Sequence, residues 1–137
     1  MQVYINFKGN CREAIEFYKE VFELGEPKIL TFGDVPSNNG EPYPEEVKSL
    51  VMHSELTIFG TIVMVSDVLP HMELTIGDNI TLVLRHNNQD TLRKIFDRLK
   101  VGGNVTMELQ ETFFSKCYGM VTDKFNIGWQ LSYQEEV

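Results

Sequence analysis

The chain has little positive charge, and this scarcity excludes two classes of partner. Its 137 residues include 12 Lys and Arg against 20 Asp and Glu, which gives a formal net charge of −8 at pH 7. A nucleic-acid-binding protein needs a basic face that displaces phosphate counterions, and an anionic membrane surface attracts basic segments. No apolar run approaches the roughly 20 residues of a membrane-spanning helix. We therefore expect neither nucleic acid nor a membrane as a partner.

Cysteine is also scarce. The two cysteines, Cys11 and Cys117, lie far apart in the sequence and match neither a paired zinc-site spacing nor a CxxC motif. We expect reduced thiols, as is usual in the cytoplasm, and a disulfide between the two halves is the alternative. The first residues enter a strand pattern without the basic and apolar regions of a secretory leader, so we expect a cytoplasmic protein.

What the chain does contain is one organisation that occurs twice. A strand pattern, an amphipathic helix pattern and further strand patterns follow one another in residues 1–68, and the same order returns in residues 78–134. Each half is too small to bury an adequate core alone. We therefore predict one α+β domain over residues 1–137, made of two modules that curl around a shared cavity.

Local signals place the elements within each module. Apolar and polar residues alternate in residues 2–8, which is typical of a strand with two unlike faces. Asn10 is expected to cap the following helix in the manner of a capping box. In the second module, Ile80 is expected to begin the alternation and to face its helix, which Asn87 or Asn88 caps.

One segment lacks any regular pattern. Residues 34–46 contain three prolines, a glycine and two asparagines, a composition that excludes regular secondary structure. A loop of this length in a compact domain is usually functional or mobile. A flap over the cavity and a tolerated surface insertion are the two interpretations.

Several stretches, in order along nearly the whole chain, resemble one family. They are Phe7-Lys8-Gly9-Asn10-Cys11-Arg12-Glu13-Ala14-Ile15-Glu16-Phe17-Tyr18, His53-Ser54-Glu55-Leu56, Val65-Ser66-Asp67, Gly102-Gly103-Asn104-Val105-Thr106-Met107, Leu109-Gln110-Glu111-Thr112-Phe113-Phe114, and Tyr118-Gly119-Met120-Val121-Thr122-Asp123-Lys124-Phe125 with Trp129. The chain resembles the PhnB-like branch of the vicinal oxygen chelate superfamily, which includes glyoxalase I, extradiol dioxygenases and the fosfomycin- and bleomycin-resistance proteins. The resemblance implies two tandem βαβββ modules that form an open, barrel-like mixed sheet around a cavity, commonly in a homodimer.

The same branch carries the label 3-demethylubiquinone-9 3-methyltransferase. A nucleotide-type cofactor site would show a Gly-rich turn after a strand and before a helix. Gly9 stands alone in the first such position, and Gly102-Gly103 follows a helix instead. The sequence therefore does not support a cofactor site of that type.

The resemblance also implies a divalent ion held by His and Glu, near the start of the first strand and in the last strand of each module. Strand alternation predicts which inward-facing residues occupy those positions here: Gln2, Met64, Asn79 and Gln130. Amides bind transition metals poorly, and a thioether suits copper(I). We therefore expect no metal cofactor. The alternative is a site rebuilt from His53, Glu55 and Asp67, although the first two are expected to be partly exposed and hydrogen-bonded.

The cavity is expected to be apolar and adaptable, with a few polar groups, as small-molecule sites usually are. Residues 112–118 are more aromatic than a loop requires. The expected ligand-binding residues are Tyr4, Asn6, Met64, Thr81, Phe113, Phe114, Tyr118, Met120 and Gln130. The alternative is that many of these side chains fill the sheet core or a dimer seam.

Three functional hypotheses follow. The favoured one is a metal-independent homodimer that binds a small molecule of unassigned identity. The second is a divalent-metal-dependent lyase, isomerase or dioxygenase, and the third is a module that binds a protein partner. No catalytic residue is assigned: no serine lies in a GxSxG motif, and Cys11 is a nucleophile candidate only because a helix start favours a thiolate.

Overall fold

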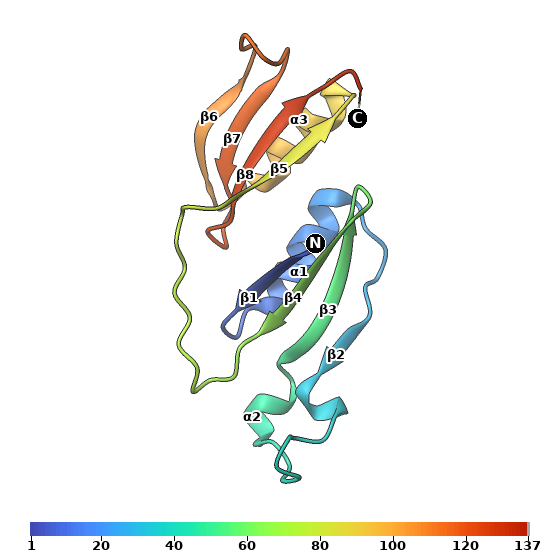
Figure 1. The fold of residues 1–137 in the computed structure, drawn as a ribbon, viewed down its shortest axis with the longest axis vertical. Coiled ribbons are helices and arrows are strands. Elements are labelled where there is room, and N and C mark those ends of the chain that lie inside the picture. The colour runs from blue at the N-terminus through green and yellow to red at the C-terminus, as the bar shows by residue number, and fades with distance from the viewer. Residues whose placement is uncertain (137) are drawn as a thin grey trace. The chain divides into compact units, whose positions relative to one another are not determined.

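The computed structural model describes residues 1–136 and confirms the α+β class. Contacts divide the chain into two compact units, Met1–Thr75 and Ile76–Val137. Each unit is built on one open, four-stranded mixed sheet with a helix against one face (Figure 1). None of the helices in the described residues combines the length and apolarity needed to cross a membrane.

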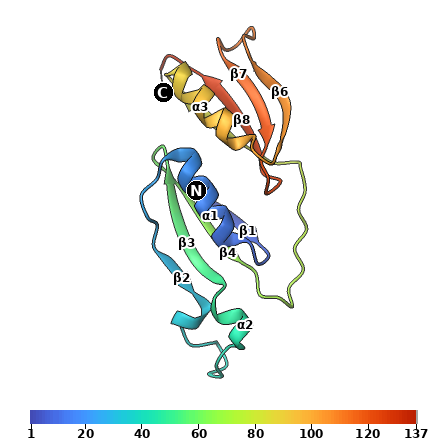
Figure 2. The same ribbon diagram turned by 180° about the vertical axis from the view of Figure 1, so that it is seen from behind.

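The first unit has the strand order β1-β4-β3-β2. The parallel pair is β1 (Val3–Phe7) with β4 (Thr61–Asp67), and the antiparallel pairs join β4 to β3 (Val51–Ile58) and β3 to β2 (Ile29–Thr31). Helix α1 (Cys11–Phe22) covers one face, as Figure 2 shows from behind. The opposite face carries no helix, and we call it the first open face.

The core of this unit lies between α1 and the sheet. Six helix residues are buried, at the spacing of one helix face: Cys11, Ala14, Ile15, Tyr18, Val21 and Phe22. Alternate strand residues meet them, including Leu56, Ile58, Val63 and Val65. Burying a side chain of this kind stabilises the fold by roughly 1.5–3 kcal/mol relative to leaving it in water. The alternation therefore fixes which strand residues remain for the first open face.

The predicted helix cap is wrong in its chemistry. Asn10 occupies the N-cap position of α1, but its side chain makes no capping hydrogen bond. The Oδ1 atom of Asp67 instead accepts a bond of 3.0 Å from the backbone N–H of Cys11. A carboxylate from the end of β4 thus replaces the local cap, which a reading of neighbouring residues cannot reveal.

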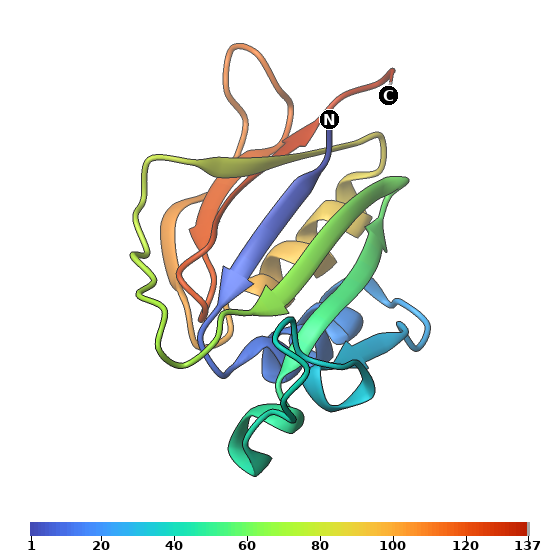
Figure 3. The same cartoon turned by 60° about the horizontal axis from the view of Figure 1, so that its bottom comes forward.

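The segment between β2 and β3 is more ordered than its composition suggests. It begins in a 3-10 turn, η1 (Phe32–Asp34), whose N-cap Thr31 forms a capping box with Asp34. It ends in a short helix, α2 (Glu45–Lys48), which the sequence did not predict. The rings of Phe32 and Tyr43 pack edge to face with centroids 5.4 Å apart. Figure 3 shows this segment projecting beyond the end of the first sheet.

The second unit repeats the plan with the order β5-β8-β7-β6. Strand β5 (Thr81–His86) runs parallel to β8 (Gly128–Tyr133), which pairs antiparallel with β7 (Tyr118–Thr122), and β7 pairs with β6 (Asn104–Gln110). Helix α3 (Gln89–Leu99) covers one face, and its N-cap is Asn88, whose Oδ1 accepts from Thr91 N–H at 3.0 Å. This prediction is confirmed. Ile80, in contrast, precedes β5 and is 76% exposed, so its predicted place against the helix is wrong.

Candidate functional site

The uncovered face of the second sheet, which we call the second open face, holds four of the nine expected ligand-binding residues. Trp129 and Leu131 of β8 are buried towards α3, so Gln130 between them lies on the opposite side. The register sets Gln130 beside Met120 of β7 and Val83 of β5. Tyr118 and Thr81 lie on the same face by the same alternation.

Three of these side chains form a hydrogen-bonded chain across three strands. The hydroxyl of Tyr118 donates to Oε1 of Gln130 at 2.6 Å, and Nε2 of Gln130 donates to Oγ1 of Thr81 at 2.8 Å. Both ends of the amide are therefore engaged, the oxygen by the Tyr118 hydroxyl and the nitrogen by the Thr81 hydroxyl. The hydrogen-bonded chain keeps unused donors and acceptors: the second N–H of Gln130, the hydroxyl hydrogen of Thr81 and the lone pairs of the Tyr118 hydroxyl.

A hollow of about 390 Å³ lies at the Thr81 end of this chain. Six of its ten lining residues are polar, and the lining comes from the ends of the strands, the segment before β5 and the β7–β8 turn: Asp78, Thr81, Asn104, Thr106, Met120, Val121, Thr122, Asn126, Gly128 and Trp129. A Cβ atom on Gly128 would lie 2.8 Å from Cγ2 of Thr81. Glycine at this position therefore leaves Thr81 free to hold its bond to Gln130.

Phe113 and Phe114 lie elsewhere, in the loop between β6 and β7. Phe113 is fully exposed and Phe114 about half-exposed, at 53%. Their rings form an edge-to-face series, with centroids 5.1 Å apart between the two phenylalanines and 4.8 Å from Phe114 to Tyr118. Only Phe114 therefore touches the hydrogen-bonded chain, and it does so through the Tyr118 ring.

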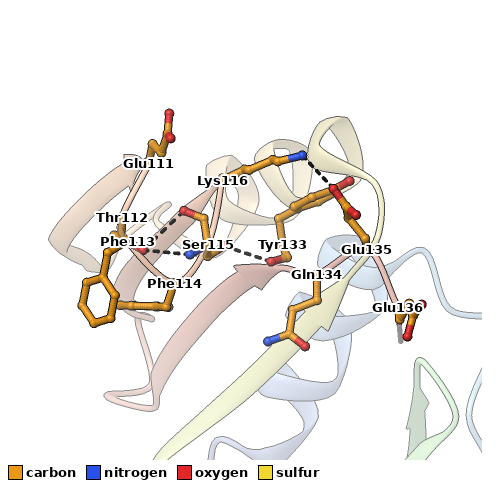
Figure 4. A pocket seen from close by; sticks show the side chains of 10 residues that line it. All are labelled: Glu111, Thr112, Phe113, Phe114, Ser115, Lys116, Tyr133, Gln134, Glu135 and Glu136. Carbon is orange, nitrogen blue, oxygen red and sulfur yellow. Dashed lines mark hydrogen bonds and ion pairs between the residues drawn. The ribbon is translucent and has the colours of Figure 1, made fainter.

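These two phenylalanines line a second hollow, of about 620 Å³, together with the C-terminal residues (Figure 4). Ser115 Oγ donates to the carbonyl of Tyr133 at 2.9 Å, and Lys116 Nζ pairs with Glu135 Oε1 at 2.7 Å. That pair raises the pKa of Lys116 and lowers the pKa of Glu135, in both cases chiefly through their mutual hydrogen bond. Because both groups are exposed, solvent screens the pair and it contributes little to stability.

The first open face carries the remaining three expected residues and has a different character. Tyr4 donates its hydroxyl to Oγ of Ser66 at 2.9 Å, and Asn6 lies beside Ser66 in the register. Met64 lies between Tyr4 and Glu55 in adjacent strands. His53 packs its ring 6.0 Å from that of Tyr4, and its Nε2 lies 3.4 Å from Oε1 of Glu55.

The residues present do not fit the divalent ion that the resemblance implies. Gln130 already uses both ends of its amide within the protein, and Gln2 and Asn79 are exposed outside the strands. In the rebuilt alternative, Asp67 is 4% exposed and bonds to the backbone N–H groups of Cys11 and Val51, towards the helix side. His53 and Glu55 lie on the other face. Within residues 1–136 no group of three His, Cys, Asp or Glu side chains is placed to hold an ion.

The cysteines are not arranged for nucleophilic chemistry. Both are buried free thiols. Burial, followed by the nearby carboxylate of Asp67, raises the pKa of Cys11 to about 12. Burial therefore disfavours the thiolate at Cys11 that a helix start alone would favour.

Sequence reasoning missed most of the hollow beside Thr81. Asn104, Thr106 and Thr122 sit at alternate positions of β6 and β7, so strand alternation alone was a sufficient signal for them. Asp78 and Asn126 come from a linker and a turn, whose approach to the strand ends has no local signature.

Comparisons with known proteins match this fold and these motifs. A family model described as 3-demethylubiquinone-9 3-methyltransferase matches residues 1–132. Protein YjdN of Escherichia coli is 29% identical, over 94% of this chain and 91% of its own. The crystal structure of protein PA1353 from Pseudomonas aeruginosa is 30% identical, with 98% of each chain covered and a TM-score of 0.81.

A more distant solved structure shares the fold. The fosfomycin resistance protein FosX from Listeria monocytogenes is 11% identical, with a TM-score of 0.63 over 96% of this chain and 90% of that one. The chain thus belongs to the 3-demethylubiquinone-9 3-methyltransferase family.

Proposed function

We propose that this protein binds a small organic molecule on the second open face, without a metal ion, and that it works as a homodimer in the cytoplasm. The observation that carries the proposal is the chain from Tyr118 through Gln130 to Thr81, beside a hollow of about 390 Å³. A hydrogen-bonded chain that is held in place before binding loses little entropy when a ligand joins it.

The composition of the site supports binding of a neutral or mixed-polarity ligand. Met120 supplies a flexible apolar surface next to Gln130, and Thr81 connects the hydrogen-bonded chain to the hollow. Small-molecule sites commonly combine such a surface with a few fixed polar groups. The three polar groups here are the amide of Gln130, the aliphatic hydroxyl of Thr81 and the phenol of Tyr118, and none of them carries a formal charge.

Metal-free binding is supported by the chemistry at Gln130. An amide oxygen is a poor ligand for a transition metal, and Oε1 of Gln130 already accepts a hydrogen bond from Tyr118. On the first open face, His53 and Glu55 together offer two metal-ligating side chains. A divalent-metal-dependent lyase, isomerase or dioxygenase that uses this pair is therefore the alternative function.

The family description names a methyltransferase, but the helix starts do not support that chemistry. A single glycine, Gly9, precedes α1, and two asparagines precede α3. Neither is the Gly-rich turn that cradles a nucleotide-type cofactor. We therefore do not propose methyl transfer.

The homodimer rests on the family resemblance and has its own measurement. Sedimentation velocity of the purified protein is expected to give twice the 15.8 kDa mass of the chain. A monomer at all concentrations would refute the dimer and leave the ligand site untouched.

The binding proposal is tested with a fragment library. We expect hits in a thermal-shift screen to perturb the backbone amide signals of Thr81, Met120 and Gln130 in ¹⁵N–¹H correlation spectra. Gln130→Ala is expected to weaken the binding of these hits by about tenfold or more. This factor corresponds to the loss of roughly one good hydrogen bond and to the partner group that is left without its bond. Tyr4→Phe, on the other sheet, is the matched control and leaves them unchanged. Hits that require an added divalent ion, or hits that map only to His53 and Glu55, would overturn the proposal.

A further inference from the structure

The lining of the hollow beside Thr81 carries charge of one sign only, and that charge is negative. Asp78 is the one charged side chain among its lining residues, and no Lys, Arg or His takes part. The chain as a whole carries a net charge of −8. A concave site with a single carboxylate and no basic group attracts cations and repels anions.

The polar lining of the hollow is also unengaged. The side chains of Asp78, Asn104, Thr106, Thr122 and Asn126 have no hydrogen bond or ion pair with any of residues 1–136. Elsewhere on the same face, the polar side chains of Tyr118, Gln130 and Thr81 are bonded to one another. Five polar groups without a partner within residues 1–136 therefore lie together at the Thr81 end of the face.

These groups offer a defined pattern to a ligand. Amides and aliphatic hydroxyls both donate and accept, which matches the hydroxyl groups of a ligand, whereas a carboxylate only accepts, which matches an ammonium group. The apolar contribution comes from Met120, at the edge next to Gln130, and from Val121 and Trp129. A volume of about 390 Å³ lies within the range of small-molecule sites.

We infer that the ligand of this hollow is a hydroxylated amine, whose ammonium group binds the carboxylate of Asp78 and whose hydroxyl groups bind the amides and threonines around it. This inference rests on the proposed function, because it names the ligand class for the same face. It adds a residue, Asp78, that determines specificity by charge.

The test uses three probes of similar size that differ in charge: glucosamine as the ammonium form, glucose as the neutral form and gluconate as the anion. Each is titrated into the ¹⁵N-labelled protein below neutral pH, and the backbone amide shifts of Asn104, Thr122 and Asn126 are followed. We expect glucosamine to bind at least about fivefold more tightly than glucose, and gluconate not to bind. Added sodium chloride is expected to weaken the binding of glucosamine and to leave the binding of glucose unchanged.

Variants assign the preference to one carboxylate. Asp78→Asn is expected to make the affinities for glucosamine and glucose equal. Asp97→Asn, an exposed carboxylate on α3 that pairs with Lys100, is the matched control and keeps the preference. Asp78 is exposed, so its replacement leaves the fold intact.

The outcomes separate this inference from the proposed function. Equal shifts with all three probes, a preference that survives Asp78→Asn, or no shifts with these probes while library fragments still bind at Gln130, would each overturn the hydroxylated amine alone. No binding of any probe or fragment on this face would overturn the proposed function as well.

Discussion

The two open faces share a topology and differ in chemistry. In each unit a parallel pair of strands forms one edge of the sheet, β1 with β4 and β5 with β8. The first face presents titratable groups in contact, with His53 Nε2 3.4 Å from the Glu55 carboxylate. The second presents the neutral bonds of Gln130 to Tyr118 and Thr81. A repeated fold thus fixes where side chains stand, and the individual residues decide what they do.

The buried carboxylates of the two units make the same contrast. Asp67 bonds to the N–H groups of Cys11 and Val51, which lie 56 and 16 residues away in sequence. Asp123 bonds to the N–H groups of Phe125 and Ile127 and to the indole of Trp129, all within six residues. One carboxylate joins distant elements, and the other organises a single turn.

The largest expected effect comes from removing these carboxylates. Asp123→Ala leaves three donors without their acceptor, and Asp67→Ala leaves two. Each buried, unsatisfied donor costs about 1–3 kcal/mol, so we expect losses of about 3 kcal/mol or more, with Asp123→Ala the greater. Urea unfolding followed by circular dichroism measures both. A greater loss for Asp67→Ala would show that tying distant elements outweighs the number of bonds.

A smaller effect is expected from the glycines that follow the two helices. A Cβ on Gly103, after α3, would lie 2.2 Å from the carbonyl oxygen of Thr122, whereas one on Gly25, after α1, would meet nothing within 4 Å. We expect Gly103→Ala to cost about 2 kcal/mol, as overpacking does, and Gly25→Ala to be neutral or slightly stabilising. Thermal denaturation of the two variants side by side gives the difference. Equal melting temperatures would refute the close packing of Gly103, the residue before β6, against the end of β7.

Tyrosine hydroxyls allow a finer comparison of the open faces. Tyr118→Phe removes the donor to Gln130, and Tyr4→Phe removes the donor to Ser66. Each is expected to cost about 1 kcal/mol of unfolding free energy. Only Tyr118→Phe should broaden or shift the side-chain amide signals of Gln130 in ¹⁵N–¹H spectra and weaken the library fragments. Equal losses of fragment binding in both variants would contradict the assignment of the site to the second sheet.

The smallest effect concerns Cys11 and is a pH dependence. Its folded pKa is raised to about 12 from an ordinary value of 9.0, mainly by burial. Above about pH 9 the unfolded chain releases this proton while the folded chain retains it, so the stability linked to Cys11 is complete below pH 9 and declines as the pH rises towards 12. Cys11→Ala should flatten that part of the curve.

Alkylation of the thiols adds a kinetic readout to the same comparison. Cys11 and Cys117, one in each unit, are both buried, so iodoacetamide is expected to label neither under native conditions. The order in which they react as urea is added reports which unit opens first. Rapid native labelling of Cys11 would contradict its burial.

The sequence predicted the elements well and the long-range contacts poorly. Hydrophobic alternation predicted that Gln130 and Thr81 face inward, because side-chain direction in a strand follows a period of two, and the register sets them on one face with Met120 and Tyr118. Local spacing limited the cap of α3 to Asn87 or Asn88, and the structure shows Asn88 in that role. Residues governed by their neighbours in the chain were therefore within reach.

The failures have a common physical cause. Asn10 is a good capping residue by type, yet a carboxylate 56 positions from Cys11 supplies the bond to the helix start. Asp67 was grouped with His53 and Glu55 as donors, but its oxygens satisfy backbone N–H groups on the helix side. Burial that depends on tertiary packing has no local signature, so neither result follows from sequence spacing.

The closure of the segment between β2 and β3 has a practical consequence. Phe32 N–H donates to the carbonyl of Leu50 at 3.1 Å, and the N–H of the next residue, Val51, is held by Asp67. The two ends of the excursion are thus fastened to each other and to the sheet, independently of what lies between them. Foreign peptides inserted near Asn39 and Gly40 should therefore be displayed by this scaffold without disturbing its strands, which makes the excursion a natural place for an affinity tag or a reporter dye.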